Sequence, residues 1–191
     1  MGMACFIVDA LLTGAQLPRH LRSIRQSGLP DHLVPIIVTN TCTDARLALL
    51  EQRYHVHGLI TPPLTLGARL NQAAYISQSE WLLIALHKTP MAAPLWIELY
   101  PQLDTYALDA LMIGSDPRRF SERLLQHFLG STVTIPPYIA IRWSWLERLG
   151  GFDPELDESA LVDFLQRIYA CPTRIRTISS AYSAHNPGLT I

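Results

Sequence analysis

Apolar runs alternate with amphipathic segments along the chain. Four apolar runs predict buried strands: 4–8, 34–38, 59–60 and 81–86. Between them, leucine, isoleucine and tyrosine recur at helical spacing and predict three helices: 17–24, 45–54 and 68–76. A succession of strand, helix and strand is typical of parallel strands joined by helical crossovers, so the first half predicts a doubly wound α/β sheet.

The second half continues this alternation with less regular spacing. We expect helices over 94–103, 117–130 and 158–170, and strands over 110–113, 138–141, 175–178 and 181–184. The last of these helices has the clearest pattern, because Leu161, Phe164, Leu165 and Ile168 fall on one face. No linker or internal repeat interrupts the chain, which predicts a single domain over 1–191.

Composition narrows the classes of partner. Of the 191 residues, 16% are charged, against about 25% in average proteins. The formal net charge of -1 and the absence of a Lys/Arg cluster exclude nucleic acid and a polybasic membrane anchor. No apolar run approaches the roughly 18 residues that a membrane span needs. Cys5, Cys42 and Cys171 stand apart and no leader precedes the first strand, which favours reduced thiols and a cytoplasmic location.

Several segments together resemble one enzyme family. The run from Leu149 to Leu156 (LGGFDPEL), followed by a helix through Asp163 and Arg167, is similar to the C-terminal motif of family 2 glycosyltransferases, Gly-Gly-Phe-Asp-Glu and then Glu-Asp-x-Asp-Leu with an arginine. Four further segments resemble that family in the same order, so the resemblance covers nearly the whole chain: 17–24, 36–44, 67–73 and 81–96.

This resemblance implies the GT-A fold, a Rossmann-like mixed sheet that is mostly parallel with helices on both faces. It implies a nucleotide-binding half over 1–100 and an acceptor-side half over 101–191. It further implies a nucleotide-sugar donor, a divalent metal on a D-x-D motif and a carboxylate as general base. A departing diphosphate needs a cation held by hard oxygen ligands, and an acceptor hydroxyl needs a carboxylate within hydrogen-bond reach.

The sequence departs from the family where that chemistry is performed. The family's residues that contact the nucleotide fall on Asp9, Thr39 and Asn40, with Asp44 in the turn that follows. The D-x-D motif falls on Leu86-His87-Lys88, where no side chain is a hard oxygen ligand, so we expect no metal. The Glu-Asp pair falls on Ala160 and Leu161, with only Asp163 retained.

Several polar residues could take over the lost roles, and each has an ordinary alternative. Asp157, Glu158 or Asp163 could act as a displaced base, although acids near a helix N-terminus are common dipole partners. His87 and Lys88 could present positive charge to a diphosphate, or form a polar strand end.

The acceptor side offers a second group of candidates. Arg142, Trp143 and Trp145 could form an acceptor platform, or pack in the core or against a partner. His185 falls where many GT-A enzymes carry a late histidine near the metal, which makes it a candidate for the same rim.

Two functions from different classes follow. The first is a degenerate glycosyltransferase that serves as a binding or assembly subunit in a biosynthetic pathway. The second is an active, metal-independent glycosyltransferase that moves a sugar from a nucleotide-sugar to an unknown acceptor. A nucleotidyltransferase is set aside, because the segment Leu11 to Ala15 carries only one glycine where that class has a glycine-rich phosphate loop. The expected partners are a nucleotide-sugar, a protein or a second copy of this chain.

Overall fold

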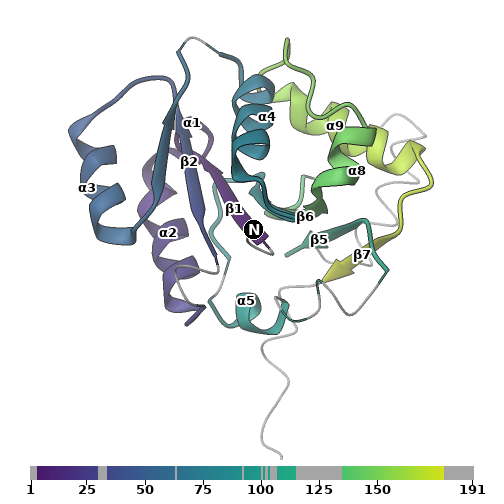
Figure 1. Cartoon of the computed structure of the whole chain (residues 1–191), viewed down its shortest axis with the longest axis horizontal. Helices are drawn as coiled ribbons and strands as arrows, with labels where there is room; N and C mark the ends of the chain where they lie inside the picture. The colour runs from purple at the N-terminus through teal and green to yellow at the C-terminus, as the bar shows by residue number, and fades with distance from the viewer. Residues whose placement is uncertain are drawn as a thin grey trace, which may run out of the picture.

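Seven strands form one mixed sheet in the computed structural model, which describes residues 4–29, 34–62, 64–91, 93–99, 101, 103, 107–114 and 135–178 (Figure 1). The strand order is β3-β2-β1-β4-β6-β5-β7. Neighbouring strands are parallel except where β6 pairs with β4 and with β5. The predicted α/β fold with a mostly parallel sheet is therefore confirmed.

The predicted elements that fall on described residues occur in the predicted order, and two short helices, α1 and α8, were not predicted. The strands are β1 (Ala4–Asp9), β2 (Ile36–Asn40), β3 (His57–Ile60), β4 (Trp81–Ala85), β5 (Ala110–Ile113), β6 (Tyr138–Arg142) and β7 (Ile175–Ile178). The α-helices are α1 (Ala10–Thr13), α2 (Leu17–Gln26), α3 (Ala45–Tyr54), α4 (Leu66–Ser77), α5 (Ala93–Leu99), α8 (Trp143–Arg148) and α9 (Ser159–Ala170), with a 3-10 turn, η1 (Gly14–Gln16), before α2. None of the described helices has the length and apolar character needed to cross a membrane.

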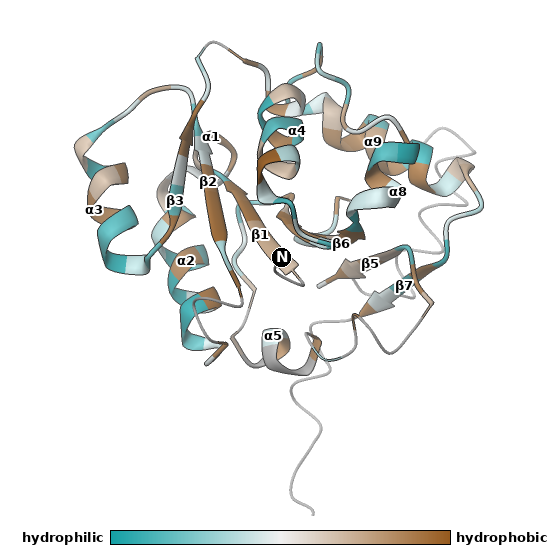
Figure 2. Cartoon of the chain, in the orientation of Figure 1, coloured by the Kyte–Doolittle hydropathy of each residue, from teal (hydrophilic) through white to brown (hydrophobic). Residues whose placement is uncertain are grey.

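Two hydrophobic cores lie on opposite faces of the sheet, because successive residues of a strand point to opposite sides. Phe6 and Val8 of β1 pack with α2, α3 and α5 on one face. Cys5 and Ile7 pack with α4, α8 and α9 on the other. Figure 2 shows the apolar strands between these two groups of helices. The sheet is therefore covered on both faces, as predicted.

Local chemistry explains where two elements differ from the predicted bounds. The second strand begins at Ile36 rather than at residue 34, because Pro35 has no N–H to contribute to a ladder. The helix predicted over 68–76 begins earlier, at Leu66, because the Thr65 hydroxyl accepts a hydrogen bond from the N–H of Ala68 and caps it. The predicted helix over 117–130 and the predicted strand over 181–184 lie outside the described residues.

Candidate functional site

Asp9 and Thr39 meet at the carboxyl edge of the parallel strands. They are register partners at the ends of β1 and β2. In each strand, the residue two positions earlier packs in the core that α4 covers. Residues two apart in a strand point to the same face, so the side chains of Asp9 and Thr39 both point toward α4. Both are completely buried. The sequence therefore places two polar groups side by side where the resemblance puts the nucleotide.

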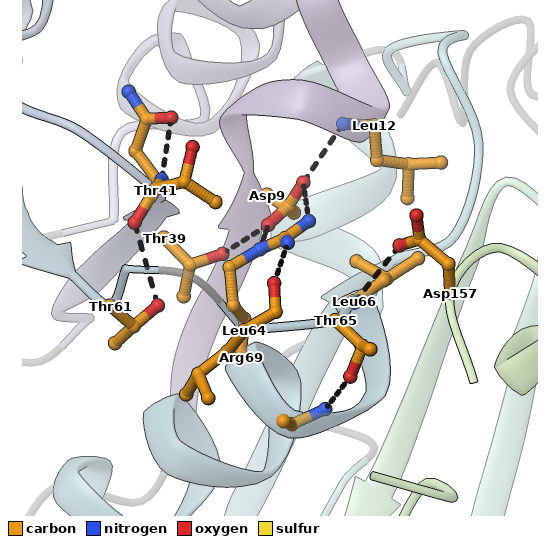
Figure 3. A network of polar contacts seen from close by, with 12 residues as sticks. Asp9, Leu12, Thr39, Thr41, Thr61, Leu64, Thr65, Leu66, Arg69 and Asp157 are labelled. Carbon is orange, nitrogen blue, oxygen red and sulfur yellow. Dashed lines mark hydrogen bonds and ion pairs between the residues drawn. The ribbon is translucent and has the colours of Figure 1, made fainter. Parts of the chain in front are cut away.

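Arg69 of α4 fills the space in front of this pair (Figure 3). Its Nε donates to Asp9 Oδ2 at 2.7 Å and its Nη2 to Oδ1 at 3.1 Å. The Thr39 hydroxyl donates to Oδ2 at 2.7 Å, and the Leu12 N–H donates to Oδ1 at 2.8 Å. A carboxylate offers about four acceptor positions, and these four donors occupy them. Asp9 is therefore fully satisfied within the protein.

Arg69 was not among the predicted site residues, although the helix pattern contained a signal for it. Leu66, Arg69, Leu70 and Ala73 follow the i, i+3, i+4, i+7 spacing of a buried face. Arg69 is 4% exposed, and its third polar contact is Nη1 to the carbonyl of Leu64 at 2.6 Å. An arginine on a core-facing helix position needs a buried carboxylate, because an unpaired charge there is strongly destabilising.

Asn40 and Asp44, the other predicted nucleotide contacts on this strand, hold local backbone. The Asn40 side chain accepts a hydrogen bond from the N–H of Thr41 at 2.8 Å. The backbone carbonyl of Asn40 accepts a hydrogen bond from the N–H of Thr61 at 2.9 Å. The Asp44 carboxylate accepts from the N–H of Leu47 and caps α3, as the sequence predicts. Both residues stabilise the edge of the sheet.

His87 and Lys88 follow β4 at the same edge of the sheet, and both side chains are exposed. His87 Nδ1 lies 2.9 Å from the hydroxyl of Thr89 and accepts the Thr89 N–H at 3.2 Å. Leu86, at the first position of the expected D-x-D motif, is buried in the core. This loop therefore presents an imidazole and an ammonium group to solvent.

A buried histidine that the sequence analysis missed supports this loop from below. His20 of α2 is fully buried, and its Nε2 lies 3.2 Å from the carbonyl oxygen of Lys88. Its Nδ1 is hydrogen-bonded to the hydroxyl of Tyr138, the first residue of β6. The carbonyl can only accept, so Nε2 carries the proton and Nδ1 accepts from Tyr138. The spacing of Leu17, His20 and Leu21 on one helix face was the available signal.

Burial controls the ionisation of these groups. Burial lowers the pKa of His20 below 6.5, and the electrostatic effect of the neighbouring His87 lowers it further, against the opposing effect of the Lys88 carbonyl. Burial likewise raises the pKa of Tyr138 far above its ordinary range. His20 is therefore neutral at pH 7 and acts as a structural support of the loop rather than as an exposed acid or base.

The residues at this edge do not fit the metal that the family resemblance implies. Hard divalent cations take carboxylate, carbonyl or water oxygens. Leu86 offers none and is buried, and the ring nitrogen of His87 that faces the loop is engaged by Thr89. No group of three metal-ligating side chains occurs within the described residues.

The Gly-Gly-Phe-Asp segment docks onto the start of α4, close to Arg69. Asn71 Nδ2 donates to the carbonyl of Phe152 at 2.7 Å, and its Oδ1 accepts the Phe152 N–H at 2.9 Å. The N–H of Gly67 donates to the carbonyl of Leu156 at 3.2 Å, and a Cβ on Gly67 would lie 2.0 Å from the carbonyl oxygen of Asp153. Two of the segments that carry the resemblance, 67–73 and 149–156, are thus packed together.

The three predicted candidate bases have different surroundings. Asp157 Oδ1 accepts the N–H of Leu66 at 3.0 Å at the start of α4. Asp163 accepts two hydrogen bonds from Arg167, at 3.0 and 2.6 Å. Glu158 is exposed just before α9, and its carboxylate has no partner among the described residues. The structure therefore leaves Glu158 as the one unengaged carboxylate of the three.

The positions of the family's Glu-Asp pair are part of the core. Ala160 and Leu161 are 0% and 1% exposed and pack in the core that α9 forms with the sheet. A carboxylate at either position would be buried there. The apolar residues at these two positions therefore serve packing.

The predicted acceptor platform lies at the opposite end of the sheet from Asp9. Arg142 is the register partner of Trp81, the first residue of β4, whereas Asp9 is the last residue of β1. The Arg142 guanidinium stacks on the Trp81 ring at 4.6 Å and pairs with Glu80.

The two tryptophans of the proposed platform follow Arg142 at that same end. The backbone N–H of Trp143 donates to the backbone carbonyl of Glu80 at 2.8 Å, and the indole Nε1–H of Trp145 donates to the hydroxyl of Thr173 at 3.0 Å. Because β6 is antiparallel to β4, the chain carries Arg142, Trp143 and Trp145 away from the carboxyl edge. They therefore lie apart from Asp9, and their role as an acceptor platform stays a prediction. His185, the fourth residue of that prediction, lies outside the described residues.

Comparisons with known proteins establish what the fold resembles. No protein-family model matches the sequence, and no curated protein matches it. Solved structures do match. The Staphylococcus aureus TarS 1-349 complex with UDP-GlcNAc superposes with a TM-score of 0.72 at 18% identity, over 94% of this chain and 56% of that one. The Pyrobaculum calidifontis mannosyltransferase PcManGT with GDP-Man and Mn2+ gives 0.66 at 17%, over 93% and 55%.

A third similar structure is the Mycobacterium tuberculosis glucosyl-3-phosphoglycerate synthase with Mn2+, UDP and phosphoglyceric acid. It gives a TM-score of 0.67 at 15% identity, over 94% of this chain and 69% of that one. The chain spans little more than half the length of the first two structures. At these identities the similarity establishes the architecture alone: the chain has the GT-A fold of glycosyltransferases.

Proposed function

We propose that this chain is a degenerate glycosyltransferase domain that serves as a binding or assembly subunit in a biosynthetic pathway. One observation carries the proposal. The buried ion pair of Asp9 and Arg69 occupies the carboxyl edge of β1 and β2, where the family holds its nucleotide. The polar groups there are engaged with each other, which leaves them a structural role.

The energy of that ion pair opposes its rearrangement around a nucleotide. A ligand that recruited Asp9 or Thr39 would have to displace the guanidinium of Arg69 from a site where both charged partners are buried. Removing one partner of a buried pair costs about 3–5 kcal/mol. That penalty corresponds to a factor of about 150 to 5,000 in affinity. A donor bound in this way would therefore be weak.

The carboxylates support the same proposal. A general base has to approach the acceptor hydroxyl within hydrogen-bond distance. Asp157 holds the N–H of Leu66, and Asp163 is paired with Arg167. Movement of either one would break a contact that secures α4 or α9.

The alternative is a metal-independent glycosyltransferase, and the loop after β4 favours it. Lys88 is the only lysine of the chain, it is exposed, and its ammonium group has no partner among the described residues. With His87 beside it, it could neutralise a departing diphosphate. Glu158 would then be the base. This mechanism requires the donor to bind outside the buried Asp9 and Arg69 pair.

Calorimetric titration with UDP, GDP and their sugars, with and without Mn2+, tests the proposal. We expect no saturable binding, or only weak binding that Mn2+ does not change. Tight, Mn2+-dependent binding of any of these would contradict the degenerate-domain hypothesis.

The single lysine gives an independent readout of the alternative. Reductive methylation with 13C-formaldehyde labels Lys88 and the terminal amine alone. A nucleotide at the loop would shift the Lys88 signal, and Lys88→Ala would weaken binding while the exposed control Arg148→Ala would not. Donor binding that is metal-free and lost in Lys88→Ala would establish the alternative.

A further inference from the structure

A basic hollow lies between the ends of two helices, away from the site described above. It has a volume of about 350 Å3 and is lined by Arg22, Arg25, Gln26, Arg53, Tyr54 and His55. Three of these residues are arginines, and no carboxylate is found among the described residues that line the hollow. Such a concentration of one charge stands out in a chain whose formal net charge is -1.

The hollow lies at the opposite end of the sheet from Asp9. Helix α2 begins after the carboxyl end of β1 and α3 after that of β2, so both helices finish near the amino ends of the strands (Figure 1). Arg25 is in the last turn of α2, and Arg53 is in the last turn of α3. Occupation of the hollow therefore does not require the Asp9 and Arg69 pair to open.

Arg25 removes the electrostatic obstacle that helix ends normally present to anions. Carbonyl oxygens at a helix C-terminus carry partial negative charge and repel an anion. The Arg25 guanidinium donates to the carbonyls of Tyr54 at 2.6 Å, His55 at 2.7 Å and Val34 at 3.2 Å. The positive charge of Arg25 therefore offsets the partial negative charge of these oxygens. The same hydrogen bonds connect α2 to the end of α3.

The other two arginines provide the groups that a ligand would engage. Arg22 and Arg53 are exposed, and neither forms an ion pair within the described part of the chain. The Arg53 guanidinium lies 5.5 Å from the centre of the Tyr54 ring, a cation–π arrangement that restricts its orientation. Tyr54 is itself 7% exposed and packed in the core, so this support is rigid.

We propose that this hollow binds a phosphate-bearing anion of the size of a diphosphate, between the guanidinium groups of Arg22 and Arg53. Planar guanidinium groups bind phosphate oxygens through two parallel N–H donors, a geometry that a single ammonium group cannot provide. The volume lies at the small end of ligand sites, about 300–1,000 Å3, which suits a compact anion.

The probe for this site is inorganic pyrophosphate, titrated calorimetrically into the intact chain at about 50 mM salt, a low ionic strength at which surface charges are weakly screened. We expect saturable binding to the native chain. The double substitution Arg22→Gln with Arg53→Gln should weaken it at least tenfold. Circular dichroism should show an unchanged fold, because both side chains are exposed.

A matched control is available on the same two helices. Arg19 of α2 and Arg46 of α3 are exposed arginines near the other ends of those helices. Arg19→Gln with Arg46→Gln removes the same charge, so it should change the affinity less than twofold. An equal loss of pyrophosphate affinity in both double variants would mean that binding depends on net charge alone, which contradicts the proposal. Absence of saturable binding to the native chain would also overturn it.

A parallel titration with uridine diphosphate identifies the source of the phosphate. Tighter binding of pyrophosphate identifies the free anion as the ligand, and tighter binding of the nucleotide identifies a nucleoside diphosphate. Either order of the two affinities supports the site if the double substitution Arg22→Gln with Arg53→Gln abolishes the binding. Nucleotide binding that survives this variant belongs elsewhere on the chain and counts against the hollow.

Discussion

Substitution of Arg69 by methionine should destabilise the protein strongly. Methionine fills much of the volume of the arginine stem but leaves Asp9, which is completely buried, without its cationic partner. Two hydrogen bonds to the carboxylate are lost, at 2.7 and 3.1 Å, together with the one to the carbonyl of Leu64. The donors that remain to Asp9 are the Thr39 hydroxyl and the Leu12 N–H.

The expected loss follows from the burial of both partners. Arg69 is 4% exposed and Asp9 is 0% exposed, so water does not replace the missing contacts. Breaking a buried pair from one side costs about 3–5 kcal/mol. For a chain of this size, that loss lowers Tm by roughly 6–20 °C.

Urea unfolding followed by circular dichroism measures this change as a shift of the midpoint at constant m-value. The double variant Asp9→Asn with Arg69→Met removes both charges, while the introduced amide oxygen is still able to accept the Leu12 N–H. It should be more stable than Arg69→Met alone, because no charge remains buried. A loss below about 1 kcal/mol in Arg69→Met, the range of an exposed pair, would refute the assignment of a buried, structural ion pair.

Two further predictions concern the supports of the loop after β4 and of α4. Because burial lowers the pKa of folded His20 below 6.5, the unfolded chain binds the proton first. The contribution of His20 to the free energy of unfolding is therefore complete above pH 6.5. It is lost as the pH falls toward the pKa of His20 in the folded protein. His20→Gln should flatten that dependence in urea unfolding at pH 7.5 and 5.5. Gly67→Ala should cost about 1–3 kcal/mol or more, because its Cβ would lie 2.0 Å from the Asp153 carbonyl oxygen.

Both predictions have controls on neighbouring residues. His57 is exposed on β3, so His57→Gln removes a histidine without touching the buried ring and serves as the control. If His20→Gln and His57→Gln behaved alike, the dependence would not arise from the buried ring. Gln72 is exposed on α4, and Gln72→Ala should be close to neutral because the helix keeps its contacts. A Gly67→Ala variant as stable as Gln72→Ala would mean that the Asp153 loop does not contact α4 closely.

The sheet was predictable because its signals are local. Strands β1, β2 and β4 are short apolar runs, and the helices between them repeat leucine at helical spacing. The order of these elements alone implies parallel crossovers. The antiparallel strand β6 was not predicted as such, because its direction depends on the path of the chain between Ile113 and Tyr138.

The candidate site was predicted as a set of positions, but its contacts were not. Asp9 and Thr39 were correctly located at the ends of two strands, since strand order and length fix that edge. The partner of Asp9, Arg69, belongs to a helix and lies 60 residues later in the sequence. The separation of Arg142, Trp143 and Trp145 from that edge was not predicted, because it depends on β6 running antiparallel to β4.

The two polar residues that the sequence analysis missed share one property. Arg69 and His20 each stand at a core-facing position of an amphipathic helix, among leucines. Such a position requires a buried polar partner, and each helix brings its residue to the carboxyl edge of the sheet, where Asp9 and Tyr138 supply it. Polar groups at the end of a strand can bind a ligand or hold a helix, and a carboxylate with all its acceptor positions filled cannot do both at once. In this chain those polar groups hold the helices. The same residues can either stabilise the edge of the sheet or bind a nucleotide, but they cannot do both.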